Sequence, residues 1–367
     1  MIAIGLMSGT SCDGVDAIAL ELSSVDEPHE PRVVAHAHRA YPIDVRDLLL
    51  QPEALTAPAI AELSYELAEL YAETAQALGC VAHAAVCGVH GQTIWHAPPS
   101  KKPRIAATLQ IGSSAVVAHR LGIPVVGDLR GADIAQGGEG APIVPFTHWF
   151  FTAPKSRPRL LVNFGGIANV TVVTAAVEDV IGYDVGPGMM IADAFAKRAT
   201  GGRLQCDLDG ALSAGGKPIE ALVEALLAHP FIERAPPKST GREDFGAAFF
   251  EPILKRFAGA PANDLLASIL RATARGVAQA HARAGGICDV VLTGGGAKNP
   301  TLVADCRTLM KSSVVRVAES GVLLPDHHEP AAVALIAART LHGLPSSLPG
   351  VTGARRAARL GHIHYPD

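Results

Sequence analysis

The sequence is poor in charged and aromatic residues and has no long hydrophobic run. Charged side chains make up 18% of the 367 residues and aromatic ones 5%, and the net charge is -4. A nucleic-acid-binding surface needs clustered lysine and arginine, and no basic run of that kind occurs. No uninterrupted apolar stretch approaches the ~20 residues that span a bilayer. The composition therefore argues against a nucleic-acid partner and against a membrane partner.

Paired cysteines and a secretory leader are missing as well. The six cysteines are scattered, and none stands in a CxxC pair or in a Cys/His zinc pattern. The apolar segment 2–6 follows Met1 directly, without the basic and longer apolar segments of a signal peptide. Isolated thiols suit a reducing compartment. These features predict a cytoplasmic protein.

The common phosphate-binding and hydrolase motifs are also absent. The chain has no GxxxxGK[ST] loop and no GxGxxG at the start of a helix. Segment 9–13 (GTSCD) lacks the last glycine of the GxSxG nucleophile elbow. A phosphate site in this chain would therefore have to use another arrangement of backbone N–H groups.

Strand and helix patterns alternate along the whole chain and predict an α/β fold. Apolar segments 2–6 and 15–22 flank a glycine turn, and segments 160–164 and 170–173 do the same roughly 155 residues later. A repeat on this scale predicts duplicated domains rather than a solenoid. The glycine-rich loop at 131–142 is the expected crossing. We therefore expect one domain at 1–130, joined by the tail 345–367, and a second at 131–344.

Four glycine-rich turns, at 9–14, 165–166, 186–188 and 294–296, follow apolar strands or closely resemble that setting. Glycine lets the backbone approach a ligand closely, and successive N–H groups can form an anion site. Each turn alone is explained as well by a tight bend. Four such turns with carboxylates nearby favour a nucleotide site.

A magnesium ion is expected beside the first of these turns. Mg²⁺ prefers oxygen ligands and commonly binds ATP phosphates through one or two carboxylates. Asp13 and Asp16 flank the turn and are the candidate ligands, directly or through water. The alternatives are a turn-forming residue before Gly14 and a solvent-facing strand residue.

The order of short motifs along the chain resembles that of the anhydro-N-acetylmuramic acid kinase family. The opening segment GLMSGTSCDGVD at 5–16 is followed by HGQT at 90–93, GDLR at 127–130 and GGEGAP at 137–142. The second half carries NFGGIAN at 163–169, DVGPG at 184–188, PKSTGREDF at 237–245 and GGGAKNP at 294–300. Val185 and Met189 stand where threonine and asparagine are usual in the family.

This resemblance implies a kinase of the actin/hexokinase/Hsp70-like superfamily. Its fold would be two RNase H-like (actin-like ATPase) domains with an interdomain ATP cleft. Such transferases use water to open the 1,6-anhydro bridge of their amino sugar and phosphorylate O6 with ATP. The product is N-acetylmuramic acid 6-phosphate, and the pathway is peptidoglycan recycling.

The resemblance also assigns roles to residues. Asp184 takes the position of the catalytic aspartate, a base that removes a proton from water, and Glu329 that of a substrate-side glutamate. Each is explained alone as an acid at a helix N-terminus, and we expect such a terminus to keep Asp184 ionised. The sugar and its lactyl carboxylate would be held by Gln92, Thr93, Asp128, Arg130 and segment 238–242. The nucleotide candidates are Gly9, Thr10, Ser11, Cys12, Asp13, Gly14, Val15, Asp16, Gly165, Gly166, Asn169, Gly294, Gly295, Gly296, Lys298 and Asn299.

Two other functions stay open on the sequence. An ordinary sugar or carboxylate kinase of the same superfamily would transfer phosphate without adding water. A nucleotide-switched, chaperone-like ATPase would change conformation without a small-molecule acceptor. The sequence also leaves the oligomeric state open, a homodimer included.

Overall fold

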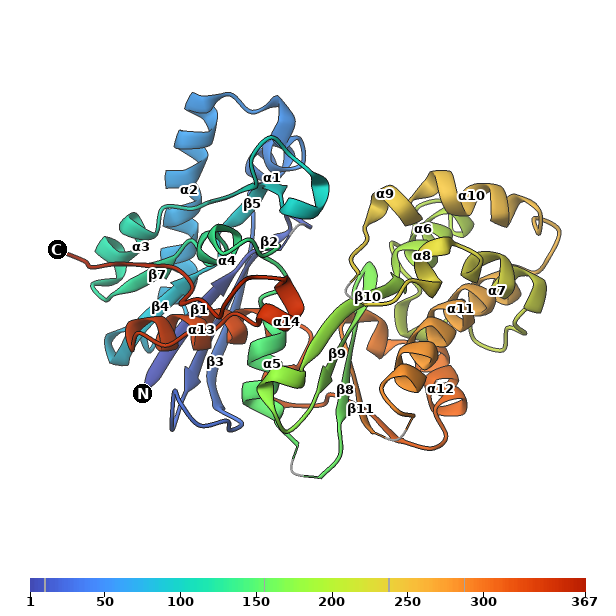
Figure 1. Cartoon of the computed structure of the whole chain (residues 1–367). Coiled ribbons are helices and arrows are strands. Elements are labelled where there is room, and N and C mark those ends of the chain that lie inside the picture. Colours follow the sequence, from blue (N-terminus) through green and yellow to red (C-terminus); the bar gives the residue numbers. More distant parts are fainter. Residues whose placement is uncertain (10, 155, 237, 287) are drawn as a thin grey trace. The chain divides into compact units, whose positions relative to one another are not determined.

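The protein has a mixed α/β fold that divides into two compact units. The computed structural model describes residues 1–9, 11–154, 156–236, 238–286 and 288–367. The first unit comprises Met1–Ala153 and Ser320–Asp367, and the second comprises Pro154–Glu319. Both ends of the chain therefore build the first unit, as the blue and red ribbons in Figure 1 show.

The first unit is built on a sheet in which the structure describes six strands. Their order is β13-β7-β4-β1-β2-β3. Strands β1, β2 and β3 form an antiparallel meander, β4 and β7 continue from β1 in parallel, and β13 pairs antiparallel at the edge. A separate hairpin joins β5 and β6. The strands are β1 (Ile2–Met7), β2 (Gly14–Glu21), β3 (Arg32–Ala40), β4 (Ala84–Val89), β5 (Gln92–Ala97), β6 (Ala107–Ile111), β7 (Val125–Gly127) and β13 (His362–His364).

Two long helices pack against the sheet of the first unit. Helix α2 (Ala57–Gln76) buries Leu63, Leu67 and Tyr71 on one face, as its helical spacing predicts. Helix α13 (His328–Leu341) is buried along almost its whole length. The shorter helices are α1 (Ile43–Leu49), α3 (Ser114–Leu121), α4 (Gly131–Ala135), α5 (Val144–Thr152) and α14 (Pro349–Thr352).

Helix α13 lies against the sheet because β1 presents a glycine to it. A Cβ atom at Gly5 would stand 1.9 Å from the carbonyl oxygen of Pro330, a distance that no side chain tolerates. The bare backbone at this position lets the first turn of α13 approach the strand. The same contact fixes the position of Glu329, the residue before Pro330, in the first turn of α13.

The second unit repeats the strand arrangement of the first. Its described strands follow the order β10-β9-β8-β11-β12, with an antiparallel meander of β8, β9 and β10 and two parallel additions. The series β3-β2-β1-β4-β7 has the same order and directions, so the predicted duplication is visible in the topology. The strands are β8 (Arg159–Phe164), β9 (Ile167–Val173), β10 (Ile181–Pro187), β11 (Asp289–Thr293) and β12 (Val314–Val317).

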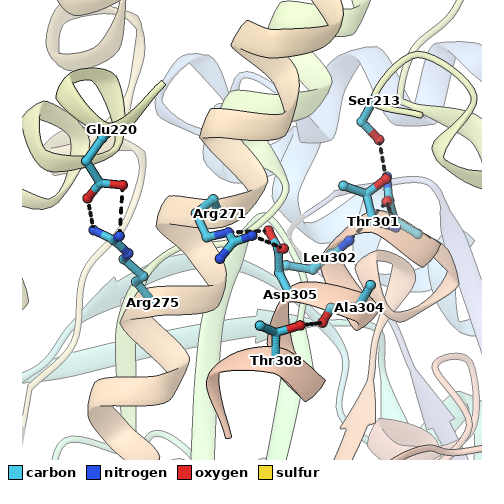
Figure 2. Close-up of polar contacts among 10 residues, drawn as sticks. Ser213, Glu220, Arg271, Arg275, Thr301, Leu302, Ala304, Asp305 and Thr308 are labelled. Atoms are coloured by element: carbon cyan, nitrogen blue, oxygen red, sulfur yellow. Dashed lines mark hydrogen bonds and ion pairs between the residues drawn. The ribbon is translucent and has the colours of Figure 1, made fainter. Parts of the chain in front are cut away.

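Ion pairs link some helices of the second unit, which pack through an apolar core. Arg271 on α11 pairs with Asp305 on α12, and Arg275 on α11 pairs with Glu220 on α7 (Figure 2). Helix α12 begins at the predicted cap, where the Asn299 side chain accepts hydrogen bonds from Thr301 N and Leu302 N. The helices are α6 (Met190–Ala199), α7 (Glu220–Leu227), α8 (Pro230–Glu233), α9 (Arg242–Phe245), α10 (Ala247–Lys255), α11 (Ala262–Arg283) and α12 (Pro300–Leu309).

The division of the chain differs from the expected one. The first crossing lies at 153/154 rather than 130/131, because α5 packs on α13 in the first unit. The chain returns at 319/320 rather than 344/345, because α13 packs on β1 and β4. The expected loop at 131–142 also contains α4. Within the described ranges, no helix is both long and apolar enough to cross a bilayer.

Candidate active site

The predicted first turn lies at the carboxyl end of β1, beside the ends of β4 and β7. These three strands are parallel, so the segments that follow them emerge at one edge of the sheet. Gln92 after β4 reaches the turn and donates its Nε2–H to the carbonyl oxygen of Gly9 at 3.1 Å. Within the turn, the Ser11 hydroxyl donates to Asp13 Oδ1 at 2.8 Å. Thr10 lies outside the described residues, and Gly14, Val15 and Asp16 already belong to β2.

Gln92 is part of a buried polar network behind this turn. Its side chain is fully buried, and Oε1 accepts a hydrogen bond from the Tyr41 hydroxyl at 3.4 Å. The Tyr41 and Tyr71 hydroxyls lie 3.3 Å apart, and Tyr71 also contacts the Ser8 hydroxyl at 2.7 Å. Burial raises the pKa of Tyr71 to about 12 and raises that of Tyr41, so both phenols stay neutral. Gln92 therefore supports the turn, which differs from the direct sugar contact expected.

Arg130, after β7, is held by His90, which follows β4. The guanidinium donates to His90 Nε2 from Nε at 3.1 Å and from Nη2 at 2.8 Å. Its Nη1 donates to the carbonyl oxygen of Gly140 at 2.8 Å. Burial lowers the pKa of Arg130 to about 10, and the nearby Glu329 carboxylate opposes that shift. The structure thus brings two predicted site residues, Arg130 and Glu329, close together.

Asp128 and Thr93 have partners in the first unit. Asp128 Oδ1 accepts a hydrogen bond from Gly131 N at 3.1 Å, and its Oδ2 lies 3.5 Å from His362 Nδ1. Thr93 Oγ1 accepts from Gln110 Nε2 at 3.2 Å. Thr93 also lines an open hollow of about 510 Å³, together with Ile94, Trp95, His96, Ala97, Lys101 and Pro103. Both residues keep exposed surface from which a ligand can be reached.

The two magnesium candidates differ in their surroundings. Asp16 Oδ1 lies 3.0 Å from His38 Nδ1 and 3.5 Å from His36 Nε2. Asp13 is exposed at the turn, and its Oδ1 accepts a hydrogen bond from the neutral Ser11 hydroxyl. In the part of the chain that the structure describes, no group of three or more His, Cys, Asp or Glu side chains could hold a metal alone. A cation bound mainly by ATP phosphates needs only one or two carboxylates, and Asp13 fits that requirement better than Asp16.

In the second unit, Asp184 lies in β10 and is held by a segment far along the chain. Its Oδ2 accepts hydrogen bonds from Thr240 N at 2.9 Å and from the Ser239 hydroxyl at 3.1 Å. No residue in the described ranges donates a hydrogen bond to Oδ1. Burial raises the pKa of Asp184, while the two hydrogen bonds and the charge of Lys238 oppose the rise.

These contacts correct the expected reason for the ionisation of Asp184. Helix α6 begins only at Met190, and Asp184 does not cap it. The anion is stabilised instead by the two donors of segment 239–240 and by Lys238. Lys238 is itself fixed, because its Nζ donates to the carbonyl oxygens of Phe231 and Ile232 at 3.0 Å each. Arg242 was also expected to bind the sugar, and its side chain lies outside what the structure describes.

The predicted glycine turns of the second unit meet at the carboxyl ends of β8, β10 and β11. Gly188 N donates to Gly166 O at 2.9 Å, and Met189 N donates to Gly165 O at 2.8 Å. A Cβ atom at Gly188 would stand 2.3 Å from Gly165 O, so this contact requires glycine. The remaining nucleotide candidates of this unit are the half-buried Asn169, the buried Gly294 and Gly296, the exposed Gly295 and Lys298, and Asn299, whose side chain caps α12.

Two functional contacts were not foreseen from the sequence. The pairing of Asp184 with Ser239 and Thr240 spans 55 and 56 residues, and no local pattern announces it. Asp133 is buried and accepts hydrogen bonds from Gly140 N and from the Thr352 hydroxyl, both at 2.8 Å. It therefore fixes the loop whose Gly140 carbonyl holds Arg130. Asp133 lies within the short helix α4, and no motif in the sequence pointed to it.

A comparison with protein families decides the assignment. The family described as anhydro-N-acetylmuramic acid kinase matches residues 1–366. The chain belongs to this family. Its members are phosphotransferases, and the whole described architecture falls within the match.

Two solved structures have limited similarity to this chain. The activator of the 2-hydroxyisocaproyl-CoA dehydratase from Clostridium difficile is 16% identical, with 92% of this chain and 94% of that chain covered and a TM-score of 0.46. A ROK hexokinase from Thermus thermophilus is 17% identical, with coverages of 94% and 100% and a TM-score of 0.39. The assignment of this kinase to its family rests on the family match.

Proposed function

We propose that this kinase opens 1,6-anhydro-N-acetylmuramic acid with water and transfers the γ-phosphoryl group of ATP to O6. The observation that carries the proposal is the environment of Asp184. One carboxylate oxygen is anchored by two donors, and the other takes no hydrogen bond from any described residue. A carboxylate held in this way has a fixed orientation and a free lone pair for a proton.

The reaction balances with one base and one phosphoryl donor. Asp184 Oδ1 accepts a proton from water as the water oxygen forms a bond to the anomeric carbon C1. The bond from C1 to O6 breaks, and its electron pair goes to O6. O6 then forms a bond to the γ-phosphorus, and the bond between that phosphorus and the β,γ-bridging oxygen of ATP breaks. The products are N-acetylmuramic acid 6-phosphate, ADP and one proton.

The pKa of Asp184 suits this role. A general base is most effective when its pKa approaches the working pH while it remains ionised. Burial raises the pKa of the carboxyl, which makes the anion a stronger base. The hydrogen bonds from Thr240 and Ser239, with the Lys238 charge, oppose the rise and favour the ionised form.

The phosphate groups of ATP would be bound by the glycine turns. Gly9 and segment 11–14 in the first unit, and segments 165–166 and 294–296 in the second, present backbone at strand ends. Phosphoryl transfer depends mainly on positioning and on neutralising charge. Mg²⁺, when bound by Asp13 and the phosphates, would neutralise part of the phosphate charge.

The sugar would be held by Arg130 and Glu329. The guanidinium of Arg130 matches a carboxylate in bidentate fashion, and anhydro-N-acetylmuramic acid carries a lactyl carboxylate. Glu329 lies in the first turn of α13, near Arg130, and its carboxylate can accept hydrogen bonds from sugar hydroxyls. The product would enter peptidoglycan recycling in the cytoplasm.

One labelling experiment tests the proposal. The enzyme is incubated with ATP, Mg²⁺ and the anhydrosugar in ¹⁸O-water, and the product is weighed by mass spectrometry. We expect one phosphate and one heavy oxygen at C1, with neither formed when ATP is omitted. A phosphorylated product whose anhydro bridge is intact would show an ordinary kinase. Hydrolysis of ATP with an unmodified sugar would show a nucleotide-switched ATPase.

A further inference from the structure

His90 makes an unusual contact with a cation, because a neutral imidazole accepts two hydrogen bonds from one guanidinium. Arg130 has donors only, so His90 Nε2 must be the acceptor of the bonds at 3.1 and 2.8 Å. His90 Nδ1 lies 2.7 Å from the carbonyl oxygen of Gly91 and therefore carries the proton. The tautomer of the ring is thus fixed by its two partners.

His90 is rigidly placed and stays neutral. Its side chain is buried, and its main-chain N–H donates to Leu6 O at 3.0 Å, which ties it to β1. Burial, and then the charge of Arg130, lower the pKa of His90 to about 3. The imidazole therefore remains an acceptor at Nε2 throughout the pH range in which enzymes work.

Arg130 keeps two N–H groups for another partner. Of its five donors, one on Nε, one on Nη2 and one on Nη1 are directed at His90 and Gly140. One N–H on Nη1 and one on Nη2 donate to no acceptor among the described residues. Both acceptors that hold Arg130 are neutral, so its charge is not cancelled by them. Glu329 is the acidic group close enough to act on its pKa.

We propose that His90 is a positioning residue that aims the two remaining N–H groups of Arg130 at the carboxylate of the substrate. His90 and Gly140 fix the plane of the guanidinium from two sides, so that binding an anion costs little side-chain entropy. The consequence is selectivity for an acidic sugar over its neutral counterpart. This inference rests on the proposed function and names what sets its substrate class.

The test compares two substrates in three proteins. The substrates are the anhydrosugar acid and its primary amide, in which a neutral carboxamide replaces the lactyl carboxylate. The proteins are wild type, His90→Leu, which removes the acceptor, and His90→Gln, whose Oε1 can replace it. We expect wild type to favour the acid more than about tenfold in kcat/KM, since hydrogen bonds to charged groups are the stronger ones.

The expected pattern separates positioning from general damage. His90→Leu should lose roughly tenfold or more of kcat/KM for the acid, mainly through KM, and change little for the amide. His90→Gln should restore most of the preference. An equal loss on both substrates would overturn the inference. Failure of wild type to phosphorylate the acid at all would instead overturn the proposed function.

A second measurement needs no variant and covers the case in which His90→Leu fails to fold. In wild type with ¹⁵N-labelled histidine, the His90 ring should show a protonated Nδ1 and a bare Nε2 from pH 5 to 9. Adding the acid should shift the Nε2 resonance, and adding the amide should shift it less. A proton on Nε2, or equal shifts with both compounds, would contradict the proposal.

Discussion

The main-chain N–H of Thr240 donates to Oδ2 of Asp184 at 2.9 Å, across 56 residues of sequence. The Ser239 hydroxyl reaches the same oxygen at 3.1 Å. The loop that follows α8 therefore sets both the orientation and the ionisation of the proposed base.

Removing one of these donors should move the pH profile. In Ser239→Ala the carboxylate loses a hydrogen bond that lowers its pKa, so the pKa of Asp184 rises further. The base is then protonated at a higher pH, and the acid limb of kcat should move to higher pH with a few-fold loss below neutrality. Ser239→Thr, which keeps the hydroxyl, is the matched control and should follow wild type. An unmoved acid limb in Ser239→Ala would contradict this account of the base.

Gln92 should affect nucleotide binding rather than sugar binding. Its Nε2–H donates to Gly9 O at 3.1 Å, and its side chain is fully buried behind the turn. In Gln92→Leu we expect the KM for ATP to rise about five- to tenfold, the worth of one hydrogen bond, with the KM for the sugar nearly unchanged. Thr93→Val, beside it and partly exposed, is the control and should leave the KM for ATP unchanged. A rise in the sugar KM alone would show that Gln92 contacts the sugar.

Asp193 should make the protein less stable as the pH rises. Burial, and then repulsion from Asp207, raise the pKa of Asp193 from 3.8 to about 6. Between these values the folded state binds more protons than the unfolded state, so the free energy of unfolding falls as pH increases and levels off above about 6. Asp193→Asn should remove this slope and add about 1–3 kcal/mol at pH 7.5.

Denaturant unfolding at pH 4.5 and 7.5 measures that change. The exposed Asp179 lies in the same unit, and Asp179→Asn should leave the slope as it is in wild type. If Asp193→Asn shows the wild-type pH dependence, the raised pKa of Asp193 is not expressed in the folded protein.

The ion pair between α11 and α12 should matter more for stability than that between α11 and α7. Arg271 contacts both carboxylate oxygens of Asp305, whose side chain is 10% exposed. Arg271→Met leaves this carboxylate buried without its cation and should cost about 2–4 kcal/mol. Arg275 pairs with Glu220 and Glu224, which are 62% and 63% exposed. Arg275→Met is therefore the control, with a loss below about 1 kcal/mol. Equal losses of the two variants in thermal unfolding would refute the comparison.

Local signals predicted the elements that depend on local physics. The apolar segments 84–89 and 289–293 are β4 and β11, and the Asn299 cap marks the start of α12 as expected. Strand β3 was not foreseen, because its residues are mostly half-buried or exposed at the edge of the sheet and include two histidines. The return of α13 to the first sheet depends on its contact with Gly5, which is more than 300 residues away in sequence. Closing this contact forms a loop of nearly the whole chain, which no local pattern can indicate.

In the candidate site, too, the sequence indicated some features and missed others. The motifs indicated which residues gather at the strand ends, and Arg130 and Glu329 do lie close together. The partners that give each group its properties come from distant segments. Asp184 depends on Ser239 and Thr240, and Arg130 depends on His90 and Gly140. Hydrogen bonds between residues this far apart in sequence are set by tertiary packing, which no short sequence motif indicates.

The central claim is that Asp184 removes the proton from the attacking water. The direct measurement is turnover of the anhydrosugar by Asp184→Asn, alongside calorimetric binding of a non-hydrolysable ATP analogue. The account predicts a fall in kcat of about 10²–10⁴-fold with nucleotide affinity within a few-fold of wild type. Turnover within a few-fold of wild type would contradict it.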